Sequence, residues 1–175
     1  MIRAARPEDA RGLARLWAEF GAYYERLDPV QFQTPSPDGL VEWFEDDLTR
    51  ERSPDELWLI AARGSDLVGY ARAQILRPSE DAGRHILKTV GVTTVKTDSL
   101  MVTDAERRQG TATALMQRVE RWGIERGATE AFVISHAHSP TSVPFYEERM
   151  GYRPQTTGYW KPLGGEGPRH IWVAT

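Results

Sequence analysis

The strongest constraint on the fold lies in the middle of the chain, where an apolar run, a polar loop and an amphipathic segment follow one another. Residues 100–102 read Leu-Met-Val, and the loop after them contains Gly110. Apolar positions then recur at three- and four-residue spacing, which predicts a helix over residues 111–126 with one buried face. Gly127 is the residue type that commonly ends a helix. A second apolar run at 131–134 completes a strand–helix–strand unit.

The other patterns place this unit in a mixed α/β fold of the α+β type. A polar turn at 64–66 joins two strand-like runs and predicts a hairpin. Residues 77–84 predict a loop, and the β-branched segment 90–97 either prolongs the next strand or forms a separate arm. The expected strands are residues 2–5, 58–62, 67–76, 100–102, 131–134, 157–161 and 170–174, and the expected helices are residues 7–28, 36–50, 111–126 and 142–150.

Length and composition limit the function classes. A chain of 175 residues predicts one domain over residues 1–175. The absence of Cys excludes disulfides, thiolate metal sites and Cys nucleophiles. The formal net charge of −3 disfavours nucleic acid as the main partner. No apolar run approaches the roughly 18 to 20 residues of a membrane span, and the first residues have no apolar signal core, so we expect no membrane partner and a cytoplasmic location.

The loop before the helix at 111–126 has the features of a phosphate site. Backbone N–H groups at a helix start lack intrahelical partners and carry partial positive charge, so they form a seat for phosphate. Gly110 permits close approach to the backbone, and Ala112 is small enough not to obstruct the same surface. Arg107 and Arg108 add positive charge beside the turn. Alone, this pattern is also compatible with an ordinary capped turn on a solvated face.

Two motifs in order give the loop a more specific meaning. The run Arg107-Arg108-Gln109-Gly110-Thr111-Ala112 resembles the Arg/Gln-x-x-Gly-x-Gly/Ala signature of the GNAT superfamily of N-acetyltransferases. The run Phe145-Tyr146-Glu147-Glu148-Arg149-Met150-Gly151-Tyr152 resembles the second signature of that family. The opening of the chain, with Arg3, Glu8 and Asp9, is also similar, and the resemblance covers about residues 2–155.

The resemblance implies a largely antiparallel sheet that is splayed open between the strands at 100–102 and 131–134. Acetyl-CoA would lie in the opening as the co-substrate, with its pyrophosphate on the backbone amides of 108–113. Its pantetheine arm would pair with the open strand edge like an added strand. Ser139 stands where many members have an Asn that contacts the pantetheine or adenylate arm. The implied cofactor-binding residues are Leu100, Met101, Val102, Arg107, Arg108, Gln109, Gly110, Thr111, Ala112, Thr113 and Ser139.

The same resemblance assigns a general acid. Acetyl transfer to an amine needs a neutral nucleophile, a stabilised oxyanion and a leaving thiolate that takes up a proton. Tyr146 is the implied proton donor, because a phenol is protonated at neutral pH. Its alternative role is that of a core aromatic residue. The oxyanion would be met by a backbone N–H near Met101 or Val102, where the strands diverge.

The general base has several candidates. Asp98 lies on the same strand face as Leu100 and Val102 if residues alternate regularly, which would bring its carboxylate close to the bound acetyl group. A solvated residue at the start of a strand is its alternative role. Water alone is a further candidate. The rival residues are Glu19, Tyr23 and Tyr24 in the first helix and residues 45–47 in the second.

His136 and His138 do not predict a metal centre. His is a common metal ligand, but no third ligand stands at a telling spacing, so we expect no metal and keep both residues as candidates for an acceptor pocket or a proton relay. Trp160 and Trp172 fall on the expected late strands. They would pack within the sheet, line an acceptor pocket or form a homodimer contact.

Three functional classes remain open from the sequence. The first is an acetyl-CoA-dependent N-acetyltransferase that acts on the amine of a small molecule, a peptide or a protein. The acidic residues of the second helix, Glu42, Glu45, Asp46 and Asp47, would suit a cationic acceptor if they faced the cleft. The second class is a non-catalytic acyl-CoA sensor of the same fold. The third, an interaction domain, leaves the ordered motif pair unexplained.

Overall fold

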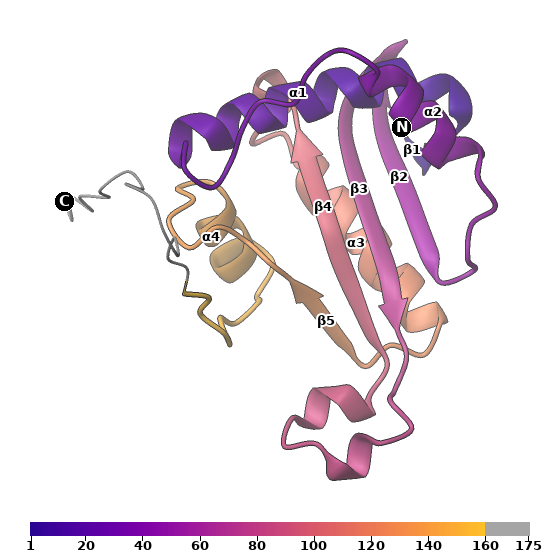
Figure 1. Cartoon of the computed structure of the whole chain (residues 1–175), viewed down its shortest axis with the longest axis vertical. Helices are drawn as coiled ribbons and strands as arrows, with labels where there is room; N and C mark the ends of the chain where they lie inside the picture. The colour runs from indigo at the N-terminus through magenta and orange to yellow at the C-terminus, as the bar shows by residue number, and fades with distance from the viewer. Residues whose placement is uncertain (160–175) are drawn as a thin grey trace.

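The computed structural model describes residues 1–159, in which five strands form one sheet in the order β1-β2-β3-β4-β5 (Figure 1). The first four strands pair antiparallel, and β5 joins β4 in parallel. A mostly antiparallel mixed sheet flanked by helices is the predicted fold class, which is thereby confirmed. The strands are β1 (Ile2–Ala4), β2 (Glu56–Arg63), β3 (Asp66–Leu76), β4 (Thr94–Val102) and β5 (Glu130–Val133).

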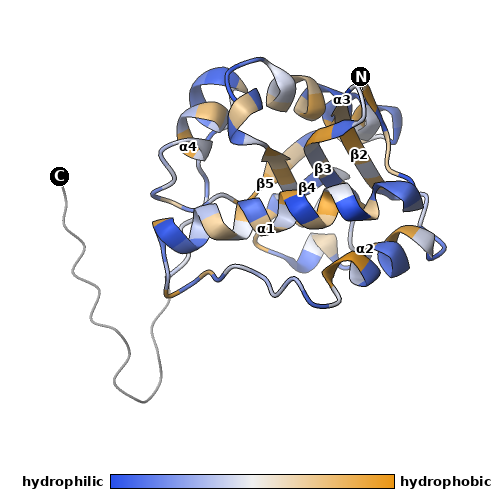
Figure 2. Cartoon of the chain, turned by 90° about the horizontal axis from the view of Figure 1, so that it is seen from above, coloured by the Kyte–Doolittle hydropathy of each residue, from blue (hydrophilic) through white to orange (hydrophobic). Residues whose placement is uncertain are grey.

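Helices cover both faces of the sheet. Viewed from above, α1 (Ala10–Leu27) and α2 (Leu40–Thr49) lie on one face and α3 (Thr111–Glu125) lies on the other (Figure 2). The short helix α4 (Ser142–Pro144) continues directly into a π-helical turn over Phe145–Arg149. None of the helices in residues 1–159 combines the length and the apolar character needed to cross a bilayer.

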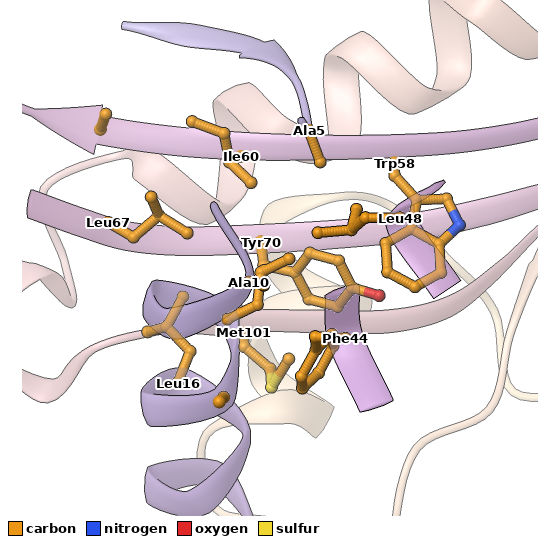
Figure 3. Close-up of a cluster of buried hydrophobic side chains, with 13 residues drawn as sticks. Ala5, Ala10, Leu16, Phe44, Leu48, Trp58, Ile60, Leu67, Tyr70 and Met101 are labelled. Atoms are coloured by element: carbon orange, nitrogen blue, oxygen red, sulfur yellow. The ribbon is translucent and has the colours of Figure 1, made fainter. Parts of the chain in front are cut away.

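Two hydrophobic clusters, one on each face of the sheet, hold these layers together. On one face, Trp58 and Tyr70 of the sheet pack with Leu16 of α1, Phe44 of α2 and Met101 of β4 (Figure 3). On the other face, a second cluster joins the apolar side of α3 to the sheet. Its members include Leu59, Ala71, Ala73, Val95, Leu115, Val119 and Trp122.

The observed elements differ from the predicted ones at several boundaries. α2 begins at Leu40 rather than near residue 36, because Gly39 precedes it with a left-handed φ of 72°. β4 begins at Thr94, so the second half of the segment 90–97 prolongs the strand. Residues 77–93 before it form a projecting arm with two short 3₁₀ turns (Figure 1). No strand includes residues 157–159; the rest of 157–161 and the expected strand 170–174 lie outside the described residues.

β4 contains an irregularity that matters for the site. Arg72 of β3 pairs with Ser99, whereas the next residue, Ala73, pairs with Thr97. Asp98 is therefore an extra residue in β4, a β-bulge that shifts the alternation of side chains beyond it.

A partly buried ion pair fixes the start of α1. The guanidinium of Arg3 donates to both carboxylate oxygens of Asp9, at 2.7 and 2.8 Å, and the Arg6 N–H donates to Asp9 Oδ2 at 2.8 Å. Asp9 is 5% exposed. These contacts, the Arg3 hydrogen bond foremost, hold the pKa of Asp9 below its ordinary value despite its burial.

We therefore predict that Asp9→Asn lowers the free energy of unfolding at pH 7 by about 2 kcal/mol, because charge-assisted hydrogen bonds are lost from a buried position. The folded-state pKa lies below the unfolded value, so this stabilisation is present above about pH 4 and is lost as the pH falls through the folded-state pKa. Urea unfolding of both proteins between pH 3 and 7 measures the difference. A constant difference over that whole range would contradict the assignment.

Candidate active site

The candidate site is a cleft that opens where β4 and β5 separate. The two strands pair only from Thr94–Glu130 to Thr97–Val133, after which β4 continues to Val102 without β5 beside it. The cleft has an empty volume of about 320 Å³, part of it open to solvent. Residues from α1, β4, the end of β5 and the α4 segment line it. They are Phe20, Tyr24, Asp98, Ser99, Leu100, Val133, Ile134, Ser135, Ser142 and Tyr146.

The unpaired edge of β4 points its main-chain groups toward this cleft. The Thr103 N–H donates to the Val68 carbonyl at 3.0 Å. In an antiparallel pair the residues alternate in direction, so Met101 and Ser99 also face β3, while Leu100 and Val102 turn their N–H and C=O groups to the open side. Of the two predicted oxyanion donors, Val102 has its N–H on the open edge and Met101 does not.

The bulge corrects the predicted orientation of Asp98. Regular alternation predicted that Asp98 shares a face with Leu100 and Val102, but those two side chains pack on the α3 face. The Asp98 carboxylate instead accepts hydrogen bonds from Gln74 Nε2 at 2.8 and 3.0 Å on the α1/α2 face. The prediction of a shared face was wrong because the extra residue breaks the period of two. Asp98 still lines the cleft with Tyr146.

The loop between β4 and α3 ends on a helix start without a side-chain cap. Gly110 has a φ of 83°, and no described atom lies within 4 Å of where its Cβ would be. The Ala114 N–H is the first to bond back, to the Gly110 carbonyl at 2.9 Å. The N–H groups of 111–113 therefore have no acceptor within residues 1–159, which is the arrangement that an anion would satisfy.

Two side chains of this loop, Arg107 and Gln109, bind to neighbouring groups of the chain. The Arg107 guanidinium lies 2.7 Å from Asp104 Oδ1 and 4.9 Å from the centre of the Tyr23 ring. Gln109 accepts a hydrogen bond from Arg63 at 2.7 Å and donates to the Ala105 carbonyl at 2.9 Å. Arg107 and Gln109 thus fix the shape of the predicted phosphate loop.

Arg108 differs from its neighbours. It has no hydrogen bond or ion pair with any other described residue, and its φ of 62° is unusual for a residue with a side chain. Its cationic side chain is therefore available at the loop.

Tyr146 reaches the cleft from the π-helical turn. That turn is closed by a hydrogen bond from the Met150 N–H to the Phe145 carbonyl at 3.0 Å, and such turns are frequent at functional sites. The Tyr146 ring packs against Tyr152, with ring centres 5.7 Å apart. Its hydroxyl makes no hydrogen bond within the described chain. Burial, together with the nearby Tyr24, raises the pKa of Tyr146 above its ordinary value, so the phenol is protonated at neutral pH.

Tyr152 anchors Tyr146 to α3 and was not singled out for a role by the sequence. Its hydroxyl donates to Glu120 Oε1 at 2.9 Å, and its N–H donates to the Tyr146 carbonyl at 2.9 Å. Burial and the Glu120 carboxylate raise the pKa of Tyr152. Tyr152 follows Gly151 as the last residue of the second motif, and this position was the signal by which the sequence could have identified it.

Ser139 lies away from the cleft surface. It is 1% exposed, and its Oγ accepts from the Ser142 N–H at 3.1 Å and bonds to Ser142 Oγ at 3.0 Å. The Tyr24 hydroxyl reaches the same Ser142 Oγ at 3.3 Å. The Ser139 hydroxyl therefore caps the turn that leads into α4, and its predicted contact with the coenzyme stays a prediction.

Of the remaining sequence candidates, Tyr24 lines the cleft, whereas Trp160 and Trp172 lie outside the described residues. The two histidines follow β5. His136 Nε2 lies 3.2 Å from Asp28 Oδ2 in a buried contact between the end of α1 and the loop after β5. Burial alone would raise the pKa of Asp28, but hydrogen bonds from Gln31 N–H, His136 and Val30 N–H lower it overall. Within residues 1–159 no three metal-ligating side chains come together.

The acidic residues of α2 lie far from the cleft along the sheet, since α2 covers the β2 side (Figure 1). Glu42, Glu45 and Asp46 are exposed there, and Asp47 pairs with Arg50 at 2.6 Å. They do not line the cleft. Glu19 is nearer and accepts from the Asp104 N–H at 3.1 Å, in contact with the predicted phosphate loop.

Comparison with known proteins agrees with this geometry. The model of the acetyltransferase (GNAT) family matches residues 14–152. An acetyl transferase of Oryza sativa subsp. japonica, GW6a, is 31% identical over 120 residues, which are 65% of this chain and 28% of the relative. The chain thus spans about a quarter of the length of that curated relative.

Solved structures share the fold at low identity. A mutant of the BH1408 protein from Bacillus halodurans superposes with a TM-score of 0.77 at 17% identity, covering 93% of this chain and 99% of its own. An aminoglycoside acetyltransferase from an uncultured soil metagenomic sample, in complex with sisomicin, has a TM-score of 0.63 at 16% identity, covering 94% and 96%.

Two serines near the cleft provide a matched stability test. We predict that Ser139→Ala lowers the free energy of unfolding by about 1 kcal/mol, because the cap of the α4 segment is lost. Ser135→Ala is the control: its buried hydroxyl has no partner among the described residues, so its removal is expected to be neutral or stabilising. Denaturant unfolding measures both, and equal effects would contradict the capping role.

Proposed function

Because the chain belongs to the acetyltransferase (GNAT) family, we propose that it transfers the acetyl group of acetyl-CoA to a primary amine by direct attack in a ternary complex. One observation carries this proposal. The cleft at the separation of β4 and β5 is lined by the Tyr146 phenol and by the open edge of β4, and the same strand leads through a short loop to the uncapped start of α3.

The chain's own groups fit the proposed coenzyme. The N–H groups of 111–113 would hold the pyrophosphate, and Arg108 would add a flexible cation beside it. The open edge of Leu100 and Val102 would pair with the pantetheine arm. Bound in this way, the coenzyme supplies an acyl thioester as the electrophile. Thr111 and Ala112 are small enough at the helix start to leave the amides accessible.

Three chain groups would then carry out the transfer. A base accepts the proton of the acceptor ammonium, for which Asp98 is the carboxylate of the cleft, acting directly or through water. The Val102 N–H stabilises the oxyanion that develops when the amine nitrogen attacks the thioester carbon. As the carbon–sulfur bond breaks, Tyr146 donates its proton to the departing thiolate. The new amide nitrogen loses its second proton to solvent, and Tyr146 recovers a proton from solvent.

The acceptor is proposed to be a small-molecule amine or an amine of a peptide or protein. Support comes from the openness of the cleft and from Asp98, which would attract an ammonium group. One relative of the same fold is named for aminoglycosides, which are small-molecule amines. Phe20 and Tyr24 of α1 line the cleft and would contact the body of the acceptor.

A non-catalytic acyl-CoA sensor is the alternative function, favoured by the same coenzyme features. Incubation with acetyl-CoA and a thiol-detecting dye, with and without a panel of amines, separates the two. Thiol release that depends on an amine supports the enzyme. Tight binding of the coenzyme without release for any amine supports the sensor, and no binding contradicts both.

We predict that Tyr146→Phe lowers kcat by roughly 10²- to 10⁴-fold, because the proton donor for the thiolate is removed. Affinity for the coenzyme, measured by calorimetry, should change little. Tyr159→Phe serves as the control, since that side chain is 94% exposed. A Tyr146→Phe enzyme with the wild-type kcat would remove Tyr146 from the acid role.

The helix start is tested by two glycines at opposite ends of α3. Gly110 and Gly127 both have a φ of 83° and no described atom within 4 Å of a built Cβ. Valine at either position therefore introduces a similar backbone strain of about 1–2 kcal/mol. We predict that Gly110→Val weakens coenzyme binding by about 10- to 100-fold, since charge-assisted hydrogen bonds are lost. Gly127→Val should bind the coenzyme normally, and equal affinities would contradict the phosphate site.

A further inference from the structure

An amine of the protein itself lies beside Asp98, a carboxylate that lines the cleft. Lys96 Nζ lies 2.8 Å from Asp98 Oδ1. The two residues stand on β4 at the point where β5 leaves the sheet, because Lys96 pairs with Phe132 of β5 and Asp98 follows the last paired residue, Thr97. The Lys96 side chain is 29% exposed, so it is open to reagents.

Asp98 connects this amine to the reaction centre. Its carboxylate lines the same cleft as Tyr146, and it is the group proposed to take the proton of the acceptor. The Lys96 ammonium therefore occupies the position at that carboxylate where an external ammonium would bind. A lysine side chain is long and flexible enough to move its nitrogen from the carboxylate into the cleft.

The residue type at position 96 is also informative. The chain contains 22 basic Lys and Arg residues, and its lysines are Lys88, Lys96 and Lys161, so arginine forms nearly all of its ion pairs. Arginine matches a carboxylate with two hydrogen bonds and stays charged. At this carboxylate the chain uses the one basic side chain that becomes nucleophilic after losing a proton.

We propose that Lys96 is an internal acceptor, and that the protein acetylates Lys96 Nζ when no external amine occupies the cleft; this rests on the proposed acetyltransferase activity. Asp98 takes a proton from the Lys96 ammonium, directly or through water. The neutral nitrogen attacks the thioester carbon, a C–N bond forms and the C–S bond breaks. Tyr146 protonates the thiolate, the nitrogen loses its second proton to solvent, and the products are Nε-acetyllysine and CoA.

The experiment uses the full chain, incubated with acetyl-CoA in the absence of any amine and analysed by peptide mass mapping over time. Lys88 is exposed on the projecting arm, remote from the cleft, and reports the rate of non-enzymatic acetylation in the same sample. We expect Lys96 to gain one acetyl group at least tenfold faster than Lys88. The fraction modified at a given time should not depend on protein concentration, because the transfer occurs within one molecule.

Two variants isolate the cause. Tyr146→Phe should slow acetylation of Lys96 by roughly 10²- to 10⁴-fold and leave that of Lys88 unchanged. Lys96→Arg preserves the ion pair with Asp98 and should abolish amine-independent thiol release. Acetylation of Lys96 at the Lys88 rate, or at an unchanged rate in Tyr146→Phe, would overturn the proposal.

The outcomes also separate this proposal from the function on which it rests. Transfer to an added amine with Lys96 unmodified overturns the internal acceptor and leaves the acetyltransferase intact. Absence of coenzyme binding, measured directly by calorimetry, overturns the proposed function itself. Coenzyme binding with no acetylation of Lys96 or of any added amine overturns the internal acceptor and favours the sensor.

Discussion

The separation of β4 from β5 is the constraint on which the site depends. A parallel pair stays closed as long as each strand offers hydrogen-bonding groups to the other. Here the pairing ends at Thr97 and Val133, and the extra residue Asp98 follows at once on β4. Beyond that residue the backbone of β4 keeps its bonds to β3 on one side and has free groups on the other. The hydrophobic clusters on both sheet faces hold β4 in place. The open edge of β4 therefore keeps its main-chain groups unpaired among the described residues.

Much of this arrangement followed from the sequence. Apolar periodicity predicted α1 and α3, the hairpin of β2 and β3, and the strand–helix–strand unit, because each pattern reflects a buried face. Gly110 was singled out before the helix because glycine permits close approach to the backbone, and the structure adds that it has a left-handed φ. These features are local, and local physical chemistry is what a single sequence encodes most directly.

The features that were missed depend on contacts between distant residues. The face of Asp98 was predicted incorrectly because a bulge is decided by the pairing of β4 with β3 and leaves no mark on the periodicity of nine residues. The hydrogen bond from the Ser142 N–H to the Ser139 hydroxyl lies in a turn that the sequence did not define. The bond between Tyr152 and Glu120 spans 32 positions and has no local signal.

α1 connects the loop before α3 to the segment before α4. Tyr23 lies beneath the Arg107 guanidinium of that loop and also shares a hydrogen bond of 2.9 Å with Thr141, just before α4. One helix thus contacts the two segments between which the substrates would bind. The coupling free energy between two binding sites is reciprocal. A ligand that shifts α1 from one segment would therefore change the binding free energy at the other segment by the same amount. If the chain acts as proposed, substitutions in α1 that change recognition of an acceptor would consequently change binding of the coenzyme as well.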